Sequence, residues 1–143
     1  MDKLYKIAHA EYMKHVKEVP GTKSNKIILD YFKAVGHSWV QSDEVAWCAA
    51  FVGACLEKAG MKSTKQLTAK SYLKWGKPTT TPKRGDIVVL SRGDVNGPYG
   101  HVGIFHGFSL ANPNLVILLG GNQSNRVKMS PYDKSRILGY RTM

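Results

Sequence analysis

Cys48 and His101 are the two residues of this sequence best suited to nucleophilic chemistry. Cys48 stands at the start of an apolar run in which Phe51 and Val52 recur at helical spacing, so its side chain should face the rest of the protein. His101 opens the strand-like segment HVGIF, where a turn enters a sheet and a side chain can face a cleft. A histidine that removes the thiol proton makes cysteine a nucleophile toward carbonyl carbon. The pair therefore predicts cysteine-dependent acyl transfer.

A position at the N-terminus of a helix would also give Cys48 an electrostatic role. Ser42 is the expected N-cap, with Asp43 and Glu44 in the first turn. Free N–H groups and the helix dipole favour an anion there, which predicts a lowered pKa for the Cys48 thiol and a site for an oxyanion. Most free cysteines are instead buried structural residues, and we accept that interpretation for Cys55. For Cys48 the choice depends on whether a base lies nearby.

His101 is the best of the five histidines as that base. His9 and His15 lie among the lysines of an expected helix and His37 lies in a loop, which indicates solvated positions. His106 has the opposite parity to His101 on the same strand, so it should point through the other face of the sheet.

The sequence leaves the roles of Asn122 and Trp47 open and predicts a structural role for Asp86. Asn122, after LVILLGG, can accept the ring N–H of His101 and fix its tautomer, but it is equally a turn asparagine. Trp47 either lines the cleft and stacks on a sugar or peptide, or packs in the core, whereas for Trp39 and Trp75 we expect core or edge packing. Asp86 is expected to hold the loop before the first core strand through side-chain hydrogen bonds.

The elements that must position these residues follow an α+β order, with helices first and strands after. Ser24 or Asn25 can cap the second helix, and Gly36 and Gly60 can end the second and third. Short apolar runs from Asp86 onward predict about five antiparallel strands, separated by turn residues. The expected helices cover residues 4–16, 27–35, 42–60 and 68–75, and the expected strands are DIVVLS, HVGIFHG, NLVILLGGN, RVKMS and RILGYRT.

Composition limits the function further. The 143 residues suit a single domain over 1–143, and a net charge of +11 predicts attraction to polyanions. The basic residues are spread along the chain without a nucleic-acid-binding pattern, so we expect no nucleic-acid partner. No stretch reaches the about 18 apolar residues of a membrane span. The N-terminus lacks a signal peptide, which favours synthesis in the cytoplasm, and the two cysteines are too far apart on one helix for a disulfide.

Several motifs, taken in order, resemble the CHAP branch of the NlpC/P60-type cysteine peptidases and amidases. They are EVAWCAAFV, PKRGDIVVL, YGHVGIFHG, ILLGGNQSNRVKMSPY and ILGYRTM, and the likeness is greatest to compact phage-associated and bacterial proteins with the motif W-C-A-A-F-V. The resemblance implies a papain-like fold, N-terminal helices on an antiparallel sheet, and hydrolysis of peptidoglycan amides. It matches Cys48 to the nucleophile, His101 to the base and Asn122 to the third polar residue. An acidic residue common in the family two positions before that asparagine is Gly120 in this chain.

The expected function is that of a peptidoglycan amidase or endopeptidase acting on the cell wall, as a phage endolysin. The alternatives are a secreted antibacterial effector amidase, a transamidase or acyltransferase with the same triad, and a non-catalytic basic wall-binding module. We expect a monomer without a cofactor. The segment GDVNGPYG lacks the carboxylates of a calcium loop, and the cysteine and histidine spacings do not fit zinc, so no metal site is predicted.

Overall fold

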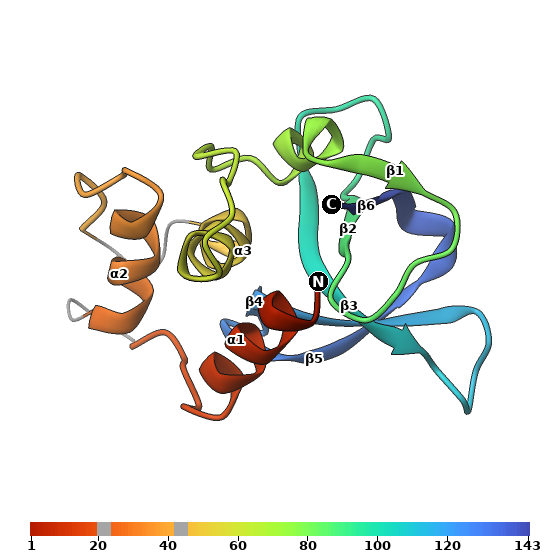
Figure 1. Cartoon of the computed structure of the whole chain (residues 1–143), viewed down its shortest axis with the longest axis horizontal. Helices are drawn as coiled ribbons and strands as arrows, with labels where there is room; N and C mark the ends of the chain where they lie inside the picture. The colour runs from red at the N-terminus through yellow and green to blue at the C-terminus, as the bar shows by residue number, and fades with distance from the viewer. Residues whose placement is uncertain (20–23, 42–45) are drawn as a thin grey trace.

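Helix α3 (Cys48–Lys58) lies between helix α2 (Lys26–Ala34) and the sheet in this computed structural model, which describes residues 1–19, 24–41 and 46–143 (Figure 1). Every residue of α3 from Cys48 to Leu56 is buried, because α2 packs on one side and strands β3 and β4 on the other. A helix that is apolar all round is stable only in such a surrounded position. The packing fixes the direction of α3 and therefore the place of its first residue.

The ends of the helices largely follow the sequence. Asn25 caps α2, its side-chain oxygen accepting a hydrogen bond from the Ile27 N–H at 2.8 Å. Gly36 and Gly60, at φ of +87° and +79°, follow α2 and α3 in the left-handed conformation that glycine adopts most easily. The expected N-cap of the third helix, Ser42, lies outside the described residues together with Asp43 and Glu44. The helix itself begins at Cys48 rather than at 42.

Helix α1 (Asp2–Tyr12) is shorter than the expected span of 4–16. The chain leaves the helix and runs beside the start of β5, where the Val127 N–H donates to the Val16 carbonyl at 2.9 Å. The Glu18 N–H likewise donates to the Asn125 carbonyl at 2.8 Å. These backbone bonds override the helical periodicity of the sequence and bring Glu18 toward the end of the sheet that holds His101.

The sheet has six strands in the order β1-β6-β2-β3-β4-β5, and all neighbouring strands are antiparallel. The five expected strands are present, and a sixth, β1, forms from residues 77–79, between the expected fourth helix and the first expected strand. The short fourth helix is present as the 3₁₀ helix η1. The bounds are η1 Ala69–Lys74, β1 Lys77–Thr79, β2 Ile87–Ser91, β3 Gly100–Phe108, β4 Leu115–Gln123, β5 Arg126–Asp133, η2 Lys134–Arg136 and β6 Ile137–Thr142.

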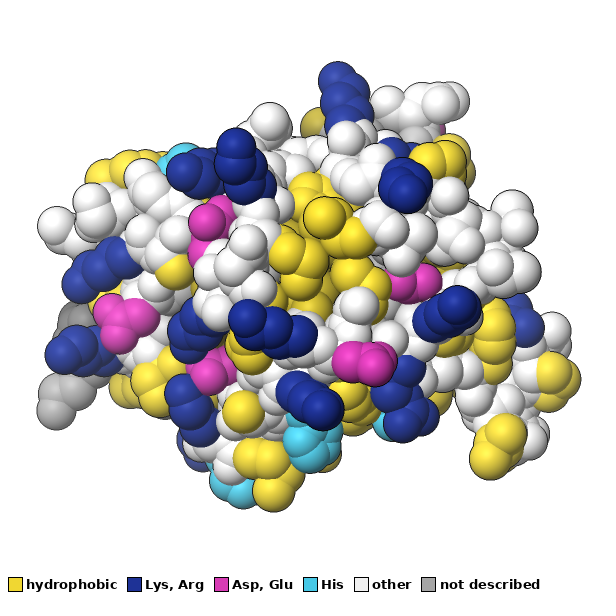
Figure 2. Space-filling model, in the orientation of Figure 1, with side chains coloured by type: hydrophobic (Ala, Val, Ile, Leu, Met, Phe, Trp, Pro, Cys, Tyr) yellow, Lys and Arg dark blue, Asp and Glu magenta, His cyan; other side chains and the backbone are white. Residues whose placement is uncertain are grey.

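The sheet is buried on both faces over β2, so alternate side chains of that strand enter two different apolar clusters. Ile87 and Val89 join the main core with the helices, whereas Val88 and Leu90 join a smaller cluster on the other face. Among the described residues no helix is long and apolar enough to cross a bilayer. Lysine and arginine side chains are scattered over the face shown in Figure 2, interspersed with apolar and uncharged groups.

Candidate active site

Cys48 is the first residue of α3, and its sulfur lies against the start of strand β3. The backbone N–H groups of Val102, Ala49 and Cys48 itself lie close enough to the sulfur to lower the pKa of the thiol. Val102 directly follows His101 in β3, so the thiol and the imidazole lie at the same end of the same strand. The two expected reactive residues are therefore brought together by the packing of α3 on the sheet.

The pKa of the Cys48 thiol differs from the expectation based on the helix N-terminus. Burial raises it above its ordinary value, and this effect outweighs the hydrogen bonds from Val102, Ala49 and Cys48 and the positive charge of Arg92, which all lower it. The prediction of a lowered pKa was wrong in direction, because only 8% of the residue is exposed. Cys48 is a neutral thiol before substrate arrives.

His101 is held by a hydrogen-bond network that fixes its tautomer. Its Nε2 lies 2.9 Å from the Gln123 side-chain oxygen and 3.3 Å from the Tyr132 hydroxyl. The Gln123 amide nitrogen donates to the carbonyls of Leu118 and Lys128, at 3.3 and 2.6 Å. Because that nitrogen is committed to two acceptors, the Gln123 oxygen must face the ring and accept its Nε2–H. The lone pair of the neutral imidazole is therefore on Nδ1, where it can receive a proton.

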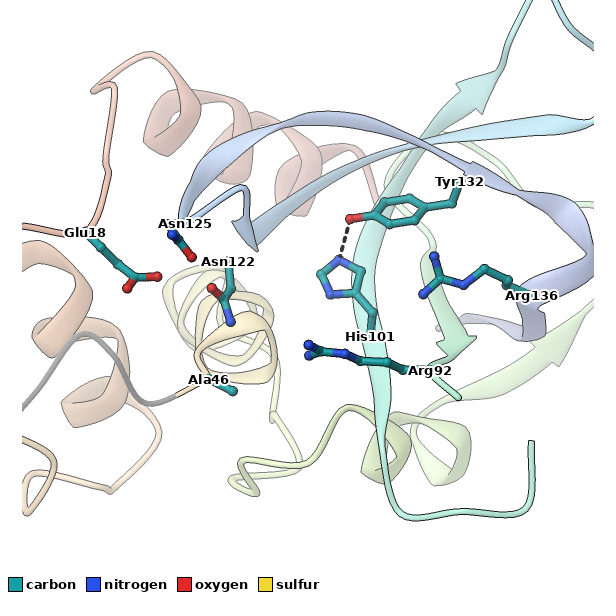
Figure 3. Close-up of a pocket in the computed structure, with 8 residues that line it drawn as sticks. All are labelled: Glu18, Ala46, Arg92, His101, Asn122, Asn125, Tyr132 and Arg136. Carbon is teal, nitrogen blue, oxygen red and sulfur yellow. Dashed lines mark hydrogen bonds between the residues drawn. The ribbon is translucent and has the colours of Figure 1, made fainter. Parts of the chain in front are cut away.

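Asn122 does not make the contact with His101 that the sequence suggested. The hydrogen bond goes to Gln123, one residue later, while Asn122 lines the same pocket from a backbone φ of +56° (Figure 3). A bulge shifts the register between β4 and β5 from Gly120 to Gln123, and this shift decides which side chain faces the histidine. The paired glycines at 120 and 121 were the signal in the sequence for such a bulge.

The imidazole is neutral over the physiological pH range. Burial lowers the pKa of His101 to about 4, with the Gln123 hydrogen bond acting in the opposite direction and the positive charges of Arg136 and Arg92 adding to the decrease. A neutral imidazole can act as a general base. His106, in contrast, lies across the sheet, where its Nδ1 is 2.6 Å from the Tyr5 hydroxyl of α1, which confirms the parity argument.

A pocket of about 420 Å³ opens beside His101 (Figure 3). Arg136 lies to the right of the imidazole in that view and Arg92 lies below it, whereas Glu18 lies far to the left, beyond Asn122. The pocket is thus polar and carries opposite charges at its two ends. Its lining residues are Glu18, Ala46, Arg92, His101, Asn122, Asn125, Tyr132 and Arg136.

The structure decides between the roles expected for the three tryptophans. Trp47 is fully buried, stacks on Tyr31 and donates its indole N–H to Glu18 at 3.0 Å. Its ring offers no surface to a substrate, so core packing is the correct one of the two interpretations. Trp39 is 65% exposed, which excludes core packing, and its ring contacts that of His37, whereas Trp75 is buried as expected.

The structural roles expected of the remaining residues are confirmed. Asp86 is buried and accepts a hydrogen bond from the Lys83 N–H at 2.8 Å, which holds the loop before β2. Cys55 is a free, fully buried core thiol. Asp94 forms a turn, accepting from the Asn96 N–H. Within the described ranges no cluster of three or more histidine, cysteine, aspartate or glutamate side chains is arranged to hold a metal ion.

Comparison with known proteins shows the fold and the family of the chain. The solved structure of a protein similar to lipoprotein, of the NLP/P60 family, from Staphylococcus aureus subsp. aureus Mu50 superposes with a TM-score of 0.52 at 14% identity. The superposition covers 99% of this chain and 41% of that chain, and it confirms the α+β fold. No curated protein matches the sequence. The family model of the CHAP domain matches residues 40–122, from before Cys48 to Asn122. The chain belongs to the CHAP domain family.

Proposed function

We propose that this chain is a peptidoglycan hydrolase that cleaves an amide bond with Cys48 as nucleophile and His101 as base. The observation that carries the proposal is the Cys48 sulfur against the Val102 N–H, one residue beyond a histidine whose Nε2 is already held by Gln123. Membership of the CHAP family supports peptidoglycan as the substrate. Residues 1–143 would act as one catalytic domain.

The reaction begins with a proton transfer from the thiol to Nδ1 of His101, as the sulfur attacks the amide carbonyl. The N–H groups at the start of α3 stabilise the negative charge that develops on the carbonyl oxygen. The imidazolium then gives its proton to the leaving amine, and the acyl group remains on sulfur as a thioester. Water, deprotonated by the same imidazole, releases the carboxylate product and restores the thiol. Gln123 accepts the Nε2–H throughout and is the positioning residue.

The charge of the protein suits a wall polymer. Carboxylates and phosphates of a bacterial envelope attract a protein with a net charge of +11, and this attraction should weaken as salt is added. The proposal includes the amide between glycan and peptide as well as amides within the peptide.

Purified sacculi provide the test. The unmodified protein should release soluble fragments with new amino groups, and mass spectrometry of those fragments identifies the cleaved bond. Cys48→Ala should lower the rate by about 10⁴-fold or more, because the nucleophile is removed. Cys55→Ala, a second buried thiol in the same helix, is the matched control and should retain activity. Fragment release by the Cys48→Ala protein would contradict the mechanism.

We propose a phage endolysin as the biological role, since the motif from Trp47 to Val52 resembles compact phage-associated relatives. Expression in a bacterial host together with a membrane-permeabilising protein should lyse the cells, whereas Cys48→Ala should leave them intact. Failure of the unmodified protein to lyse such cells, with activity on sacculi retained, would favour delivery as a secreted effector.

A further inference from the structure

Arg92 and Arg136 give the pocket a positive wall next to the reacting atoms. Arg92 follows β2 and Arg136 ends η2, so both line the pocket near His101 although they are distant in the sequence (Figure 3). Of the ion pairs among the described residues, none involves either guanidinium. The described acidic residue of the pocket, Glu18, lies at its opposite end and accepts the Trp47 indole N–H.

Arg136 is held in place by contacts that, within the described part of the chain, include no ion pair. Its Nε donates to the Ser91 carbonyl at 3.1 Å, and its guanidinium lies 5.3 Å from the centre of the Tyr132 ring. These contacts orient the planar group, and none of them uses its terminal nitrogens. A guanidinium so arranged fits the two oxygens of a carboxylate. Arg92 is exposed and can turn toward the same ligand.

Both guanidinium groups act on the catalytic pair through space. Arg136 and Arg92 contribute to the lowered pKa of His101, and Arg92 opposes the raised pKa of Cys48. An anion bound between them would cancel part of this field, so His101 would accept the thiol proton more readily once the ligand is present. Ligand binding and base strength would then be coupled at one site.

We propose that Arg92 and Arg136 bind a free carboxylate of the substrate peptide close to the scissile amide. The inference rests on the proposed function, and it places an acidic peptide, rather than a neutral sugar, in this side of the pocket. Amino-acid residues with free carboxylates are present in wall peptides, and amidation of such a carboxylate would remove the charge that the two arginines recognise.

Two synthetic wall peptides that differ only in this group, carboxylate against carboxamide, test the proposal. The unmodified protein should show kcat/KM about 10- to 100-fold higher for the carboxylate peptide, as expected for charge-assisted hydrogen bonds. Arg92→Gln should lower the ratio of kcat/KM for the carboxylate peptide to that for the carboxamide peptide about 10-fold, because any effect of Arg92 on His101 and Cys48 is common to both peptides. The double variant with Arg136→Gln should abolish the preference. Arg84→Gln, which removes a positive charge beside Tyr5 on α1, is the matched control and should keep it.

Binding to the Cys48→Ala protein separates this inference from the function itself. Titration calorimetry with the two peptides measures the preference even if no amide is cleaved. Tighter binding of the carboxylate peptide, lost in the Arg92→Gln form, would support the inference whatever the catalytic result. Equal affinity for the two peptides, or an equal loss for both in Arg92→Gln, would overturn it. Failure of the unmodified protein to cleave sacculi would instead count against the proposed function.

Discussion

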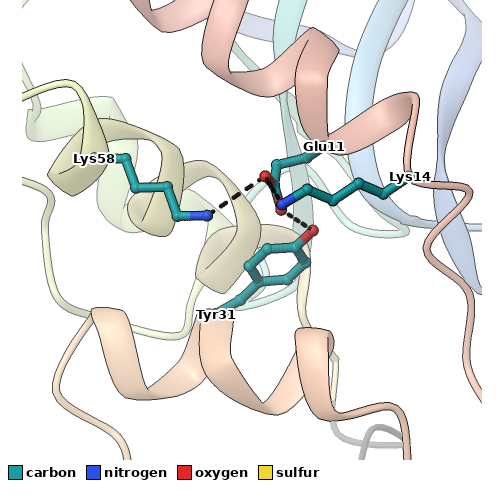
Figure 4. Close-up of polar contacts among 4 residues, drawn as sticks. All are labelled: Glu11, Lys14, Tyr31 and Lys58. Atoms are coloured by element: carbon teal, nitrogen blue, oxygen red, sulfur yellow. Dashed lines mark hydrogen bonds and ion pairs between the residues drawn. The ribbon is translucent and has the colours of Figure 1, made fainter.

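The Glu11 cluster and the His101 pocket both bring together polar groups from distant elements. The charges of the cluster are paired with one another, whereas the arginines of the pocket form no ion pair among the described residues. The Glu11 cluster consists of Glu11, Lys14, Tyr31 and Lys58, which connect α1, α2 and α3 (Figure 4). The buried carboxylate accepts the Tyr31 hydroxyl at 2.9 Å and lies 2.7 and 3.4 Å from the ammonium groups of Lys14 and Lys58. Every polar group in this cluster has a partner.

The pKa shifts in the two regions follow from the way in which their charges are paired. Burial alone would raise the pKa of Glu11, but the hydrogen bonds from Lys14 and Tyr31 and the charge of Lys58 outweigh it and hold the pKa below its ordinary value. In the pocket, burial prevails and keeps His101 and Cys48 neutral, with two guanidiniums nearby. Compensated charge stabilises the fold, whereas groups held neutral beside uncompensated charge are available for chemistry.

Of the differences between the two regions, the largest is expected in catalytic activity, which should depend on the pocket. His101→Gln should lower the rate of peptidoglycan cleavage by about 10³-fold, because no side chain would take the thiol proton. The same protein should fold, since glutamine keeps a polar group in the pocket. Rates from sacculi digestion and circular dichroism spectra measure the two quantities. Activity within a few-fold of the unmodified protein would remove His101 from the mechanism.

Acid should destabilise the protein through the pocket before it affects the Glu11 cluster. The pKa of His101 falls from 6.5 to about 4 on folding, so the unfolded chain takes up a proton first and stability is lost as the pH falls from 6.5 toward 4. The loss is on the order of 3 kcal/mol. The Glu11 contribution disappears only below its ordinary pKa of 4.5.

Urea unfolding at a series of pH values measures this dependence. The free energy of unfolding of His101→Gln should fall less steeply between pH 6.5 and 4.5, and the remaining slope is expected from His106, whose pKa burial also lowers. An equally steep decrease in that variant would assign the acid sensitivity to other groups.

Removal of the charge from the Glu11 cluster should affect stability rather than catalysis. Glu11→Leu leaves the buried Tyr31 hydroxyl without its acceptor and should cost about 2 kcal/mol in the free energy of unfolding. The exposed pair Asp30 and Lys33, 3.8 Å apart, offers the control, and Asp30→Asn should cost less than about 0.5 kcal/mol. Denaturant unfolding gives both values. Similar losses for the two variants would show that the buried carboxylate has no special role.

The smallest effect distinguishes Gln123 from Asn122 as the partner of His101. Gln123→Glu places a carboxylate against Nε2 and should raise the pKa of His101 by about 1 unit, moving the acid limb of the kcat/KM profile upward. Asn122→Asp, one residue away and without a hydrogen bond to the ring, should move that limb less. The pH dependence of kcat/KM measures both. A larger shift for Asn122→Asp would return the positioning role to Asn122.

The sequence was sufficient for features that depend on local chemistry. Apolar periodicity located the elements, and Asn25, Gly36 and Gly60 marked helix ends that the structure confirms. The order of motifs from Cys48 onward identified the family. Strand parity separated His101 from His106, because side chains alternate along a strand whatever surrounds it.

Tertiary structure decided what depends on distant partners. A bulge between β4 and β5 chose Gln123 over Asn122, and the packing of α3 buried Trp47 and reversed the expected shift of the Cys48 pKa. Burial and register arise from contacts across the whole chain. The sequence by itself therefore determined which residues could react, and the fold determined their protonation, their partners and the charges around them.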